Sequence, residues 1–427
     1  MARNNNQEML FDLPPDWKHL WKSMPDYSHE NLSPHSSIKV NFTSLENRQA
    51  FAKMVGQPVT DLTKYIWWPK ADIWRMMNKR YVTTKPVQPM YPIYIPSKGR
   101  WETRLTAKAF EKINVDYTIV VEPQEYDDYA KVIDPKKILR TPHSNEGHVK
   151  TRNFIWDHAR DLGVEKYWTF DDNIKWFYRY HNNRVIPVAS GAMFQAIESF
   201  ADRYKNLVIS GCQYTMFVTR KMGSWPPLVL NTRVYSNMLI QTTACNNSGK
   251  PYRNEGFFND DTDLCLRVLK DGNCTALFNA FLIEKSVTMT MKGGMTEHYQ
   301  GDGRFRMAKE LAEKHPDVTT ISRKWGRWQH HVDYSSFRYN ELIMKDNIAL
   351  PDEPNNFGMR MEMDDKDDEY FAQLRQREKE ENISLIDDGS YIDRDLSDYC
   401  NLPIKTDEGR DDESDEGPDA EILPEIN

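Results

Sequence analysis

Cysteine is scarce in this chain, and its spacing argues against the usual cysteine-based sites. The five cysteines include no Cys-x-x-Cys pair, and an odd number cannot be fully paired: Cys212, Cys245, Cys265, Cys274 and Cys400. A zinc cluster and a disulfide framework are therefore both disfavoured. A reducing compartment is the expected setting.

Long apolar runs are absent as well. No stretch reaches the ~18 consecutive apolar residues that a membrane-spanning helix needs, and the first residues, Met-Ala-Arg-Asn-Asn-Asn-Gln, contain no apolar signal region. No Walker loop (Gly-x-x-x-x-Gly-Lys-Ser/Thr) or Gly-x-Gly-x-x-Gly turn follows the first strand of the pattern described below, so a P-loop or NAD-type site is not supported there. These absences predict a soluble, cytoplasmic protein without a membrane partner.

Acidic charge is concentrated at one end of the chain. Of the 64 acidic and 56 basic residues, 26 acidic and 8 basic ones lie at 351–427, which leaves 38 acidic and 48 basic in the remainder. We expect residues 350–427 to form an acidic, largely disordered tail. The basic remainder suits polyanionic ligands such as nucleotide-sugars or nucleic acid, although many of its charges are expected to be solvated surface.

The rhythm of the sequence divides the rest into three parts. Residues 1–70 are expected to form an N-terminal arm and a small α+β module, with a strand at 37–42, a helix at 45–55 and a strand at 64–68. Residues 71–88 are expected to form a basic linker. The largest domain is predicted at 89–335.

Strands and helices alternate at the start of this large domain. Predicted strands lie at 91–95, 116–121, 137–140 and 166–170, with helices between them at 102–112, 123–130 and 148–162. This pattern predicts a parallel sheet covered by helices on both faces, with ligands at the carboxyl ends of the strands. The second half is mixed, with strands expected at 206–212, 214–219, 234–243 and 276–283 and helices at 192–202, 261–270 and 302–314.

An acidic pair follows the fourth predicted strand, in Phe-Asp-Asp-Asn at 170–173. Carboxylates at a ligand-binding sheet edge suit Mg²⁺ or Mn²⁺, which prefer oxygen ligands. Such an ion can neutralise a diphosphate leaving group. The structural alternative is a strand-end turn, for which Asp-Asp-Asn is favourable.

Three other polar clusters accompany this pair. Ser97, Lys98 and Arg100 follow the first strand and could hold a base, ribose or phosphates. Asp260 and Asp261 begin a helix, where the helix dipole alone favours acids, but either could also deprotonate an acceptor hydroxyl. His298 follows a glycine pair and could reach a metal or phosphate, or be structural.

Taken in order, these features resemble the GT-A glycosyltransferases over about 89–330. This resemblance implies a Rossmann-type mixed sheet with helices on both faces, a nucleotide-sugar donor (most simply a UDP-sugar) and a divalent cation, Mn²⁺ or Mg²⁺. It assigns the donor to residues near strand ends: Pro96, Ser97, Lys98, Arg100, Asn145, Gly147, Arg152 and Asp171. It assigns the metal to Asp172, Asp171 and His298, with Asp171 also facing the ribose, and the catalytic base to Asp260 or Asp261.

More narrowly, Ile-Pro-Ser-Lys-Gly-Arg, Asp-Asp-Asn and Asn-Asp-Asp-Thr-Asp-Leu resemble the TET-associated glycosyltransferases of phages. That resemblance implies a phage-encoded enzyme acting in the host cell on 5-hydroxymethylcytosine in DNA. Two departures from the family pattern are Asn173 as the third residue of the metal element and Asp260 as the first residue of the acidic pair.

Two basic stretches with aromatic residues are candidates for binding DNA. Their candidate residues are Arg75, Lys79, Arg80, Arg323, Lys324, Trp325 and Arg327. Both stretches are equally well explained as linkers or tryptophan-anchored elements with solvated charges. Alternatives for the whole protein are a glycosyltransferase with a glycan, protein or lipid acceptor, a non-catalytic DNA-binding accessory protein, and a metal-dependent phosphohydrolase.

Overall fold

A computed structural model describes most of the chain, with gaps. The described residues are 17–29, 35–61, 63, 66–69, 79–218, 226–243, 251–252, 259–286, 302–324 and 327–363. None of the helices within these ranges is long and apolar enough to cross a membrane. Most of the predicted acidic tail lies outside these ranges.

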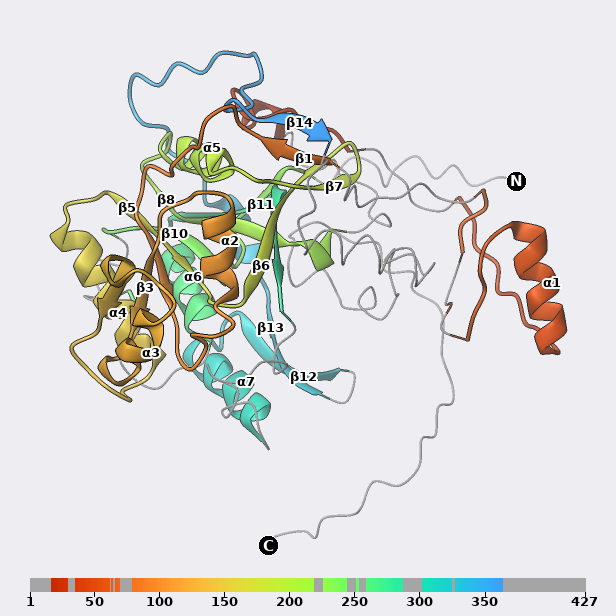
Figure 1. Ribbon diagram of the computed structural model, residues 1–427, viewed down its shortest axis with the longest axis horizontal. Coiled ribbons are helices and arrows are strands. Elements are labelled where there is room, and N and C mark those ends of the chain that lie inside the picture. Colours follow the sequence, from red (N-terminus) through yellow and green to blue (C-terminus); the bar gives the residue numbers. More distant parts are fainter. Residues whose placement is uncertain are drawn as a thin grey trace, which may run out of the picture.

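A mixed sheet of ten strands forms the centre of the described structure (Figure 1). Its strands are β2 (Ile93–Pro96), β3 (Thr118–Val121), β4 (Ile138–Arg140), β5 (Lys166–Phe170), β6 (Ile174–His181), β7 (Arg184–Pro187), β8 (Leu207–Tyr214), β9 (Leu228–Leu230), β10 (Asn237–Gln241) and β11 (Cys274–Lys285). The order is β4-β3-β2-β5-β10-β8-β11-β6-β7, and β9 pairs with β11.

The strand directions gather several loops at one edge of this sheet. Strands β2 to β5 run parallel, β10 is antiparallel to both β5 and β8, and β11 is parallel to β8. The carboxyl ends of β2, β3, β5, β8 and β11 therefore share an edge with the amino end of β10. This is the edge where ligands bind in open α/β sheets.

Helices cover both faces of the sheet, as the sequence predicts. They are α2 (Leu105–Lys112), α3 (Tyr126–Ala130), α4 (His148–Asp161), α5 (Ala192–Ala201), α6 (Asp260–Lys270) and α7 (Gly303–Lys314). Alternation within β2 shows the two faces: Ile93 and Ile95 join a core with α2 and α5, whereas Tyr94 joins a core with α4 and α6. The protein is therefore a mixed α/β fold with apolar layers on both sides of the sheet.

The second half of the sheet departs from the predicted pattern. The strand expected at 214–219 does not form, because β8 continues to Tyr214 and is followed by a 3-10 turn at Thr215–Phe217. The hairpin of β6 and β7 was not predicted. Its turn places Asn182 and Asn183 at φ of 50° and 54°, the conformation of a type I′ turn, which asparagine tolerates well.

The N-terminal module is only partly as expected. The helix α1 (Leu45–Val55) forms, with Ser44 accepting a hydrogen bond at its start and Gly56 in the left-handed region at its end. Residues 37–42 form no strand, and neither do residues 66–68. Residues 64–65 lie outside the described ranges. The alternation at 37–42 had no strand partner among the described residues, and a strand without one leaves its backbone groups unpaired.

Segments from the two ends of the described chain lie together against the sheet. Trp21, only 7% exposed, packs its ring 6.1 Å from Phe278 and 6.5 Å from Phe200. The amide of Asn355 donates to the Met24 carbonyl at 3.1 Å, and β14 (Arg360–Met363) pairs antiparallel with β1 (Lys79–Val82). The prediction from composition that the acidic tail begins at residue 350 was therefore too early. Residues up to 363 still pair with the rest of the described structure.

Met359 provides a test of this contact. It is 5% exposed in the main apolar core, whereas Met361, two residues later in β14, is 42% exposed. Met359→Ala should lower the free energy of unfolding by ~2–5 kcal/mol, since it leaves a cavity. Met361→Ala should change it by less than ~0.5 kcal/mol. Urea unfolding would measure both, and equal small effects would show that this segment adds no stability.

Candidate active site

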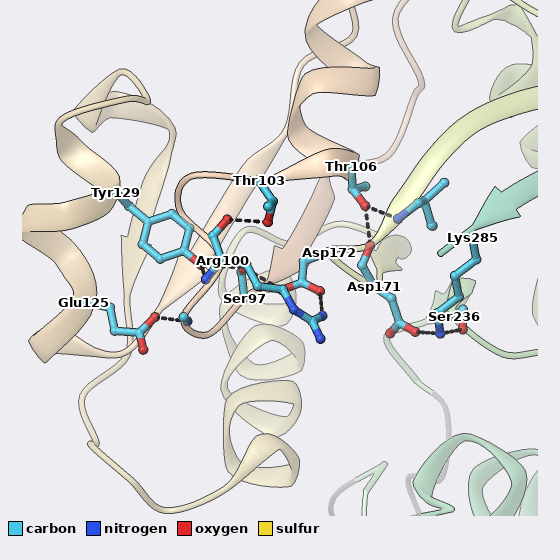
Figure 2. A network of polar contacts seen from close by, with 12 residues as sticks. Ser97, Arg100, Thr103, Thr106, Glu125, Tyr129, Asp171, Asp172, Ser236 and Lys285 are labelled. Carbon is cyan, nitrogen blue, oxygen red and sulfur yellow. Dashed lines mark hydrogen bonds and ion pairs between the residues drawn. The ribbon is translucent and has the colours of Figure 1, made fainter. Parts of the chain in front are cut away.

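Two adjacent aspartates at the end of β5 turn their carboxylates in opposite directions. Figure 2 shows Asp172 facing Ser97 and Arg100, while Asp171 faces Lys285 and Ser236. The buried Thr106 of α2 fixes the backbone between them: its hydroxyl donates to the Asp171 carbonyl at 2.6 Å. The same oxygen accepts from the amide of Ile174 at 2.9 Å. The pair therefore serves two separate networks.

The first network joins Asp172 to the loop after β2. The Ser97 hydroxyl donates to Asp172 Oδ2 at 2.7 Å, and Arg100 forms an ion pair with Oδ1. The Tyr129 hydroxyl of α3 lies 2.6 Å from Ser97 Oγ and accepts from the Arg100 amide at 3.1 Å. Burial raises the pKa of Asp172, although Arg100 and Ser97 oppose that rise.

The second network surrounds Asp171 with cations. Lys285 Nζ, at the end of β11, lies 2.6 Å from Asp171 Oδ2, and Arg152 Nη2 of α4 lies 3.3 Å from Oδ1. Burial alone would raise the pKa of Asp171, but Lys285 and Arg152 outweigh it and hold the pKa at about 2. Asp171 is therefore ionised at neutral pH.

Arg152 also connects the β5 edge to the acidic start of α6. Its Nη1 lies 3.3 Å from Asp260 Oδ2, and His148 Nε2 lies 3.5 Å from Asp260 Oδ1. Burial opposes the charge on Asp260, yet Arg152 and His148 lower its pKa below the usual value. Asp260 is thus a buried, ionised carboxylate that its neighbours hold in place.

Asp261 differs from its neighbour in both exposure and contacts. Its side chain is partly exposed, and within the described part of the chain it has no hydrogen-bond or ion-pair partner. Burial and the charge of Asp260 raise its pKa above the usual value. Of the two acids, Asp261 is therefore the one that can accept a proton at the site.

The third aspartate of this motif points into the protein. Asp263 is 1% exposed, lies 2.8 Å from His315 Nε2 and accepts from Arg267 Nε at 3.0 Å. These contacts tie α6 to the end of α7. The cluster of acids at this helix start is thus divided between a structural contact and the site.

The remaining donor residues of the sequence prediction join the same edge. Lys98 Nζ lies 2.9 Å from Glu122 Oε2 and 3.0 Å from Asn145 Oδ1, and the Asn145 amide donates to Glu122 Oε1 at 2.9 Å. Pro96 ends β2, and Gly147, at φ 92°, immediately precedes α4. All eight predicted donor residues therefore lie on the loops and helix starts around one edge.

The described residues do not provide a complete set of ligands for a metal ion. No group of three or more His, Cys, Asp or Glu side chains that could hold a metal occurs in the described ranges. The predicted ligand His298 lies outside them. Each carboxylate has both oxygens paired, Asp172 with Ser97 and Arg100 and Asp171 with Lys285 and Arg152, but the Asp171 side chain is 25% exposed and that of Asp172 only 8%. Asp171 is therefore the better placed of the two carboxylates to bind a cation.

The predicted DNA-binding residues do not form one surface. Lys79 and Arg80 lie in β1, whereas Arg323 lies in the hairpin of β12 (Thr319–Lys324) and β13 (Arg327–Val332). Figure 1 shows β1 and this hairpin at opposite sides of the sheet. Arg75 and Trp325 lie outside the described residues. Lys324 and Arg327 belong to the hairpin strands, but their side chains are not among those described.

Sequence reasoning missed several groups at this edge. They are Glu122, Tyr129, His148, Tyr214, Ser236 and Lys285. Glu122 follows β3 and Lys285 is the last residue of β11, so both come after apolar strand residues, which is the same signal that identified Asp171. Ser236 could not be found this way, because it precedes a strand and reaches the edge only since β10 is antiparallel to β5.

Residues 91–294 match the family model described as TET-Associated Glycosyltransferase. The match begins just before β2 and includes every described residue of the Asp171 and Asp172 networks. The comparison with curated proteins gave no match. The family description is that of a sugar-transferring enzyme, in agreement with a site built from carboxylates and cations at the ligand edge of the sheet. The resemblance to the TET-associated glycosyltransferases that the motifs predicted is therefore confirmed for residues 91–294 of this chain.

Proposed function

We propose that this protein is a GT-A-type glycosyltransferase that uses a nucleotide-sugar, most simply a UDP-sugar, as its donor. The observation that carries the proposal is Arg152, which contacts both Asp171 after β5 and Asp260 at the start of α6. Asp172 in turn contacts Ser97 and Arg100 after β2. Three motifs far apart in the sequence thus form one continuous polar edge.

The donor fits the side of this edge formed by β2, β3 and β5. Arg100 and Lys98 provide positive charge there, and Ser97 and Asn145 provide hydrogen-bonding groups. Nucleotides bind at such strand ends in open α/β sheets. Asp172 then positions Ser97 and Arg100 for the nucleotide.

The acceptor approaches from the α6 side in this proposal. In an inverting reaction, Asp261 takes the proton of the acceptor hydroxyl, whose oxygen forms the new bond to the anomeric carbon. The bond from that carbon to the diphosphate oxygen breaks, and its electron pair leaves with the nucleoside diphosphate. A partly exposed carboxylate with a raised pKa suits this role because the pKa lies nearer the working pH.

A divalent cation, Mn²⁺ or Mg²⁺, stays part of the proposal. When bound, it would neutralise charge on the donor diphosphate. Asp171 is the residue proposed to hold it, with His298 as a further ligand. This exchanges the roles that the sequence suggested for the two acids: Asp172 serves the nucleotide side, where Ser97 and Arg100 hold it.

The proposed acceptor is the hydroxyl of 5-hydroxymethylcytosine in DNA. Residues 319–332, which span β12 and β13, contain basic residues but no Asp or Glu. Trp328 there is 42% exposed, with the Arg323 guanidinium 5.9 Å from its ring centroid. Arginine contacts phosphates, and an exposed aromatic ring can stack on a base.

Contacts connect this hairpin to the Asp171 network. His330 Nε2 lies 3.3 Å from Arg233 Nη1, and Arg233 stacks 4.7 Å from the centroid of the Tyr235 ring. Tyr235 contacts Tyr214 at 4.6 Å between centroids, and the Tyr214 hydroxyl lies 3.5 Å from Lys285 Nζ. The hairpin is therefore a neighbour of the acceptor side of the site, unlike β1.

Arg323→Ala tests the hairpin. We expect it to weaken binding to duplex DNA of any sequence and to lower the slope of log K against log[salt] by about 1, since one phosphate contact is lost. Arg338→Ala replaces an exposed arginine beyond the hairpin and should leave the slope unchanged. Fluorescence anisotropy over a salt series measures both, and equal slopes for wild type and Arg323→Ala would rule out this contact.

The proposed function has one direct test. The full-length protein is incubated with 5-hydroxymethylcytosine DNA, Mn²⁺ and a panel of nucleotide-sugars, and the nucleosides are analysed by mass spectrometry. A hexose-sized mass increase on the modified cytosine, absent with unmodified DNA, is expected. Free phosphate or free sugar without a modified nucleoside would contradict transfer to DNA. If an added glycan received the sugar in preference to the DNA, a glycan would be the acceptor instead.

A further inference from the structure

Lys285 is the cation at the site for which the sequence motifs gave no role. It ends β11, and its Nζ lies 2.6 Å from Asp171 Oδ2 and 2.8 Å from Ser236 Oγ, with the Tyr214 hydroxyl at 3.5 Å (Figure 2). The side chain is 20% exposed and that of Asp171 is 25% exposed. The ion pair is thus partly open on the ligand edge of the sheet.

A second ion-paired lysine of the sheet, which is fully buried, shows that such a pair can be purely structural. Lys166 begins β5, is 1% exposed and lies 2.6 Å from Asp202 Oδ1. It occupies the opposite end of the strand that Asp171 follows. Both lysines lie at strand ends and pair with an aspartate, but only Lys285 is partly exposed at the ligand edge.

The charged groups around Lys285 compensate little of the negative charge that a nucleotide diphosphate would bring. Asp171, Asp260 and Asp261 bring three carboxylates to this part of the site, whereas Arg152 and Lys285 bring two cations. A diphosphate adds further negative charge, and like charges in a partly buried site repel strongly. Arg100 and Lys98 carry positive charge on the β2 side of the edge; Lys285 adds a cation on the β11 side, and lysine is a compact donor suited to phosphate.

We propose that Lys285 contacts the diphosphate of the donor, so that part of the diphosphate binding does not require a divalent cation. This inference rests on the proposed function. As the anomeric carbon–oxygen bond breaks, the electron pair passes to the diphosphate oxygen, and Lys285 remains protonated and donates a hydrogen bond to it. Ser236 and Tyr214 hold the ammonium group in position, and Asp171 balances its charge.

Binding of UDP and of uridine in EDTA tests this role. Calorimetry on the full-length wild-type protein should show UDP binding at least ~10-fold more tightly than uridine without any divalent cation. Lys285→Met should weaken UDP binding by about 10–100-fold, the usual effect of one charge-assisted hydrogen bond, and leave uridine binding within about twofold. Lys285→Arg, which keeps the charge, should recover most of the UDP affinity.

Lys166→Met is the matched control. It removes a buried, ion-paired lysine and should lower thermal stability without changing the ratio of UDP to uridine affinity. Unchanged UDP affinity in Lys285→Met would overturn the inference, as would an equal loss for uridine, which would show a structural role. If Lys285→Met does not fold, the test is the ratio of UDP to uridine affinity that the wild type shows in EDTA. A ratio near one overturns the inference.

The two proposals can fail separately. Sugar transfer to DNA together with an unaffected Lys285→Met variant would remove the role of Lys285 and keep the enzyme assignment. If the wild type bound neither UDP nor inorganic pyrophosphate, with or without Mn²⁺, both proposals would fall.

Discussion

Asp261→Asn is expected to slow sugar transfer by roughly 10²–10⁴-fold, the usual contribution of a general base. Asparagine keeps the size of the side chain but cannot accept the proton of the acceptor hydroxyl. Stability should be unchanged or slightly higher, because the substitution removes repulsion between Asp260 and Asp261. A fall in activity without a fall in stability is therefore the result that this geometry predicts.

The pH profile gives a second readout for Asp261. Its pKa is raised by burial and by Asp260, and a base must be deprotonated to act. The wild-type kcat/KM should therefore fall as pH decreases through a value above ~3.9, the ordinary pKa of aspartate. The residual activity of Asp261→Asn should lack this acidic limb.

Asp271→Asn is the matched control for this substitution. Asp271 is an exposed aspartate at the other end of α6, and its replacement should leave kcat/KM unchanged. A fall of less than about tenfold in Asp261→Asn, with the acidic limb retained, would assign proton transfer to another group.

Arg152→Met is expected to lower the free energy of unfolding by ~3–5 kcal/mol, the usual cost of removing one partner from a buried ion pair. The Arg152 side chain is 11% exposed and lies between Asp171 and Asp260, so among the described residues the variant leaves His148 as the remaining ion-pair partner of Asp260. Activity should be lost as well, because the same guanidinium connects the donor side to the acidic pair.

This destabilisation should depend on pH in a defined direction. Arg152 lowers the pKa of both Asp171 and Asp260 in the folded protein. Stability from a lowered pKa is present above the unfolded value of ~3.9 and is lost as pH falls through the folded value, about 2 for Asp171. The difference between wild type and Arg152→Met should therefore be full at pH 7, shrink as pH falls below ~3.9 and be lost as pH falls below the folded pKa values of the two acids.

Arg160→Met separates this effect from the loss of any arginine on α4. Arg160 is exposed and stacks 4.5 Å from the centroid of the Trp156 ring, and such exposed contacts contribute about 0.5–1 kcal/mol. Urea unfolding of the two variants at several pH values measures both quantities. Similar losses for Arg152→Met and Arg160→Met would show that Arg152 is not a buried link between the two acids.

The amino-acid sequence alone predicted the parallel half of the sheet and the polar residues at its ligand-binding edge. Strand β5 forms at Lys166–Phe170, where the apolar run predicted it, and α6 begins one residue earlier than predicted, at Asp260. These predictions succeeded because β2 to β5 follow a regular alternation with helices, and the direction of each strand follows from that alternation. The polar residues at each strand end were therefore placed correctly at one edge.

Tertiary structure alone decided which groups face one another at that edge. The opposite directions of Asp171 and Asp172 depend on Thr106 of α2, and the burial of Asp260 beside an open Asp261 depends on Arg152 and His148. Ser236, Tyr214 and Lys285 reach Asp171 only because β10 inserts antiparallel between β5 and β8. Pairing between strands distant in sequence leaves no local pattern, and it is this pairing that brings the Lys285 ammonium group beside the Asp171 carboxylate.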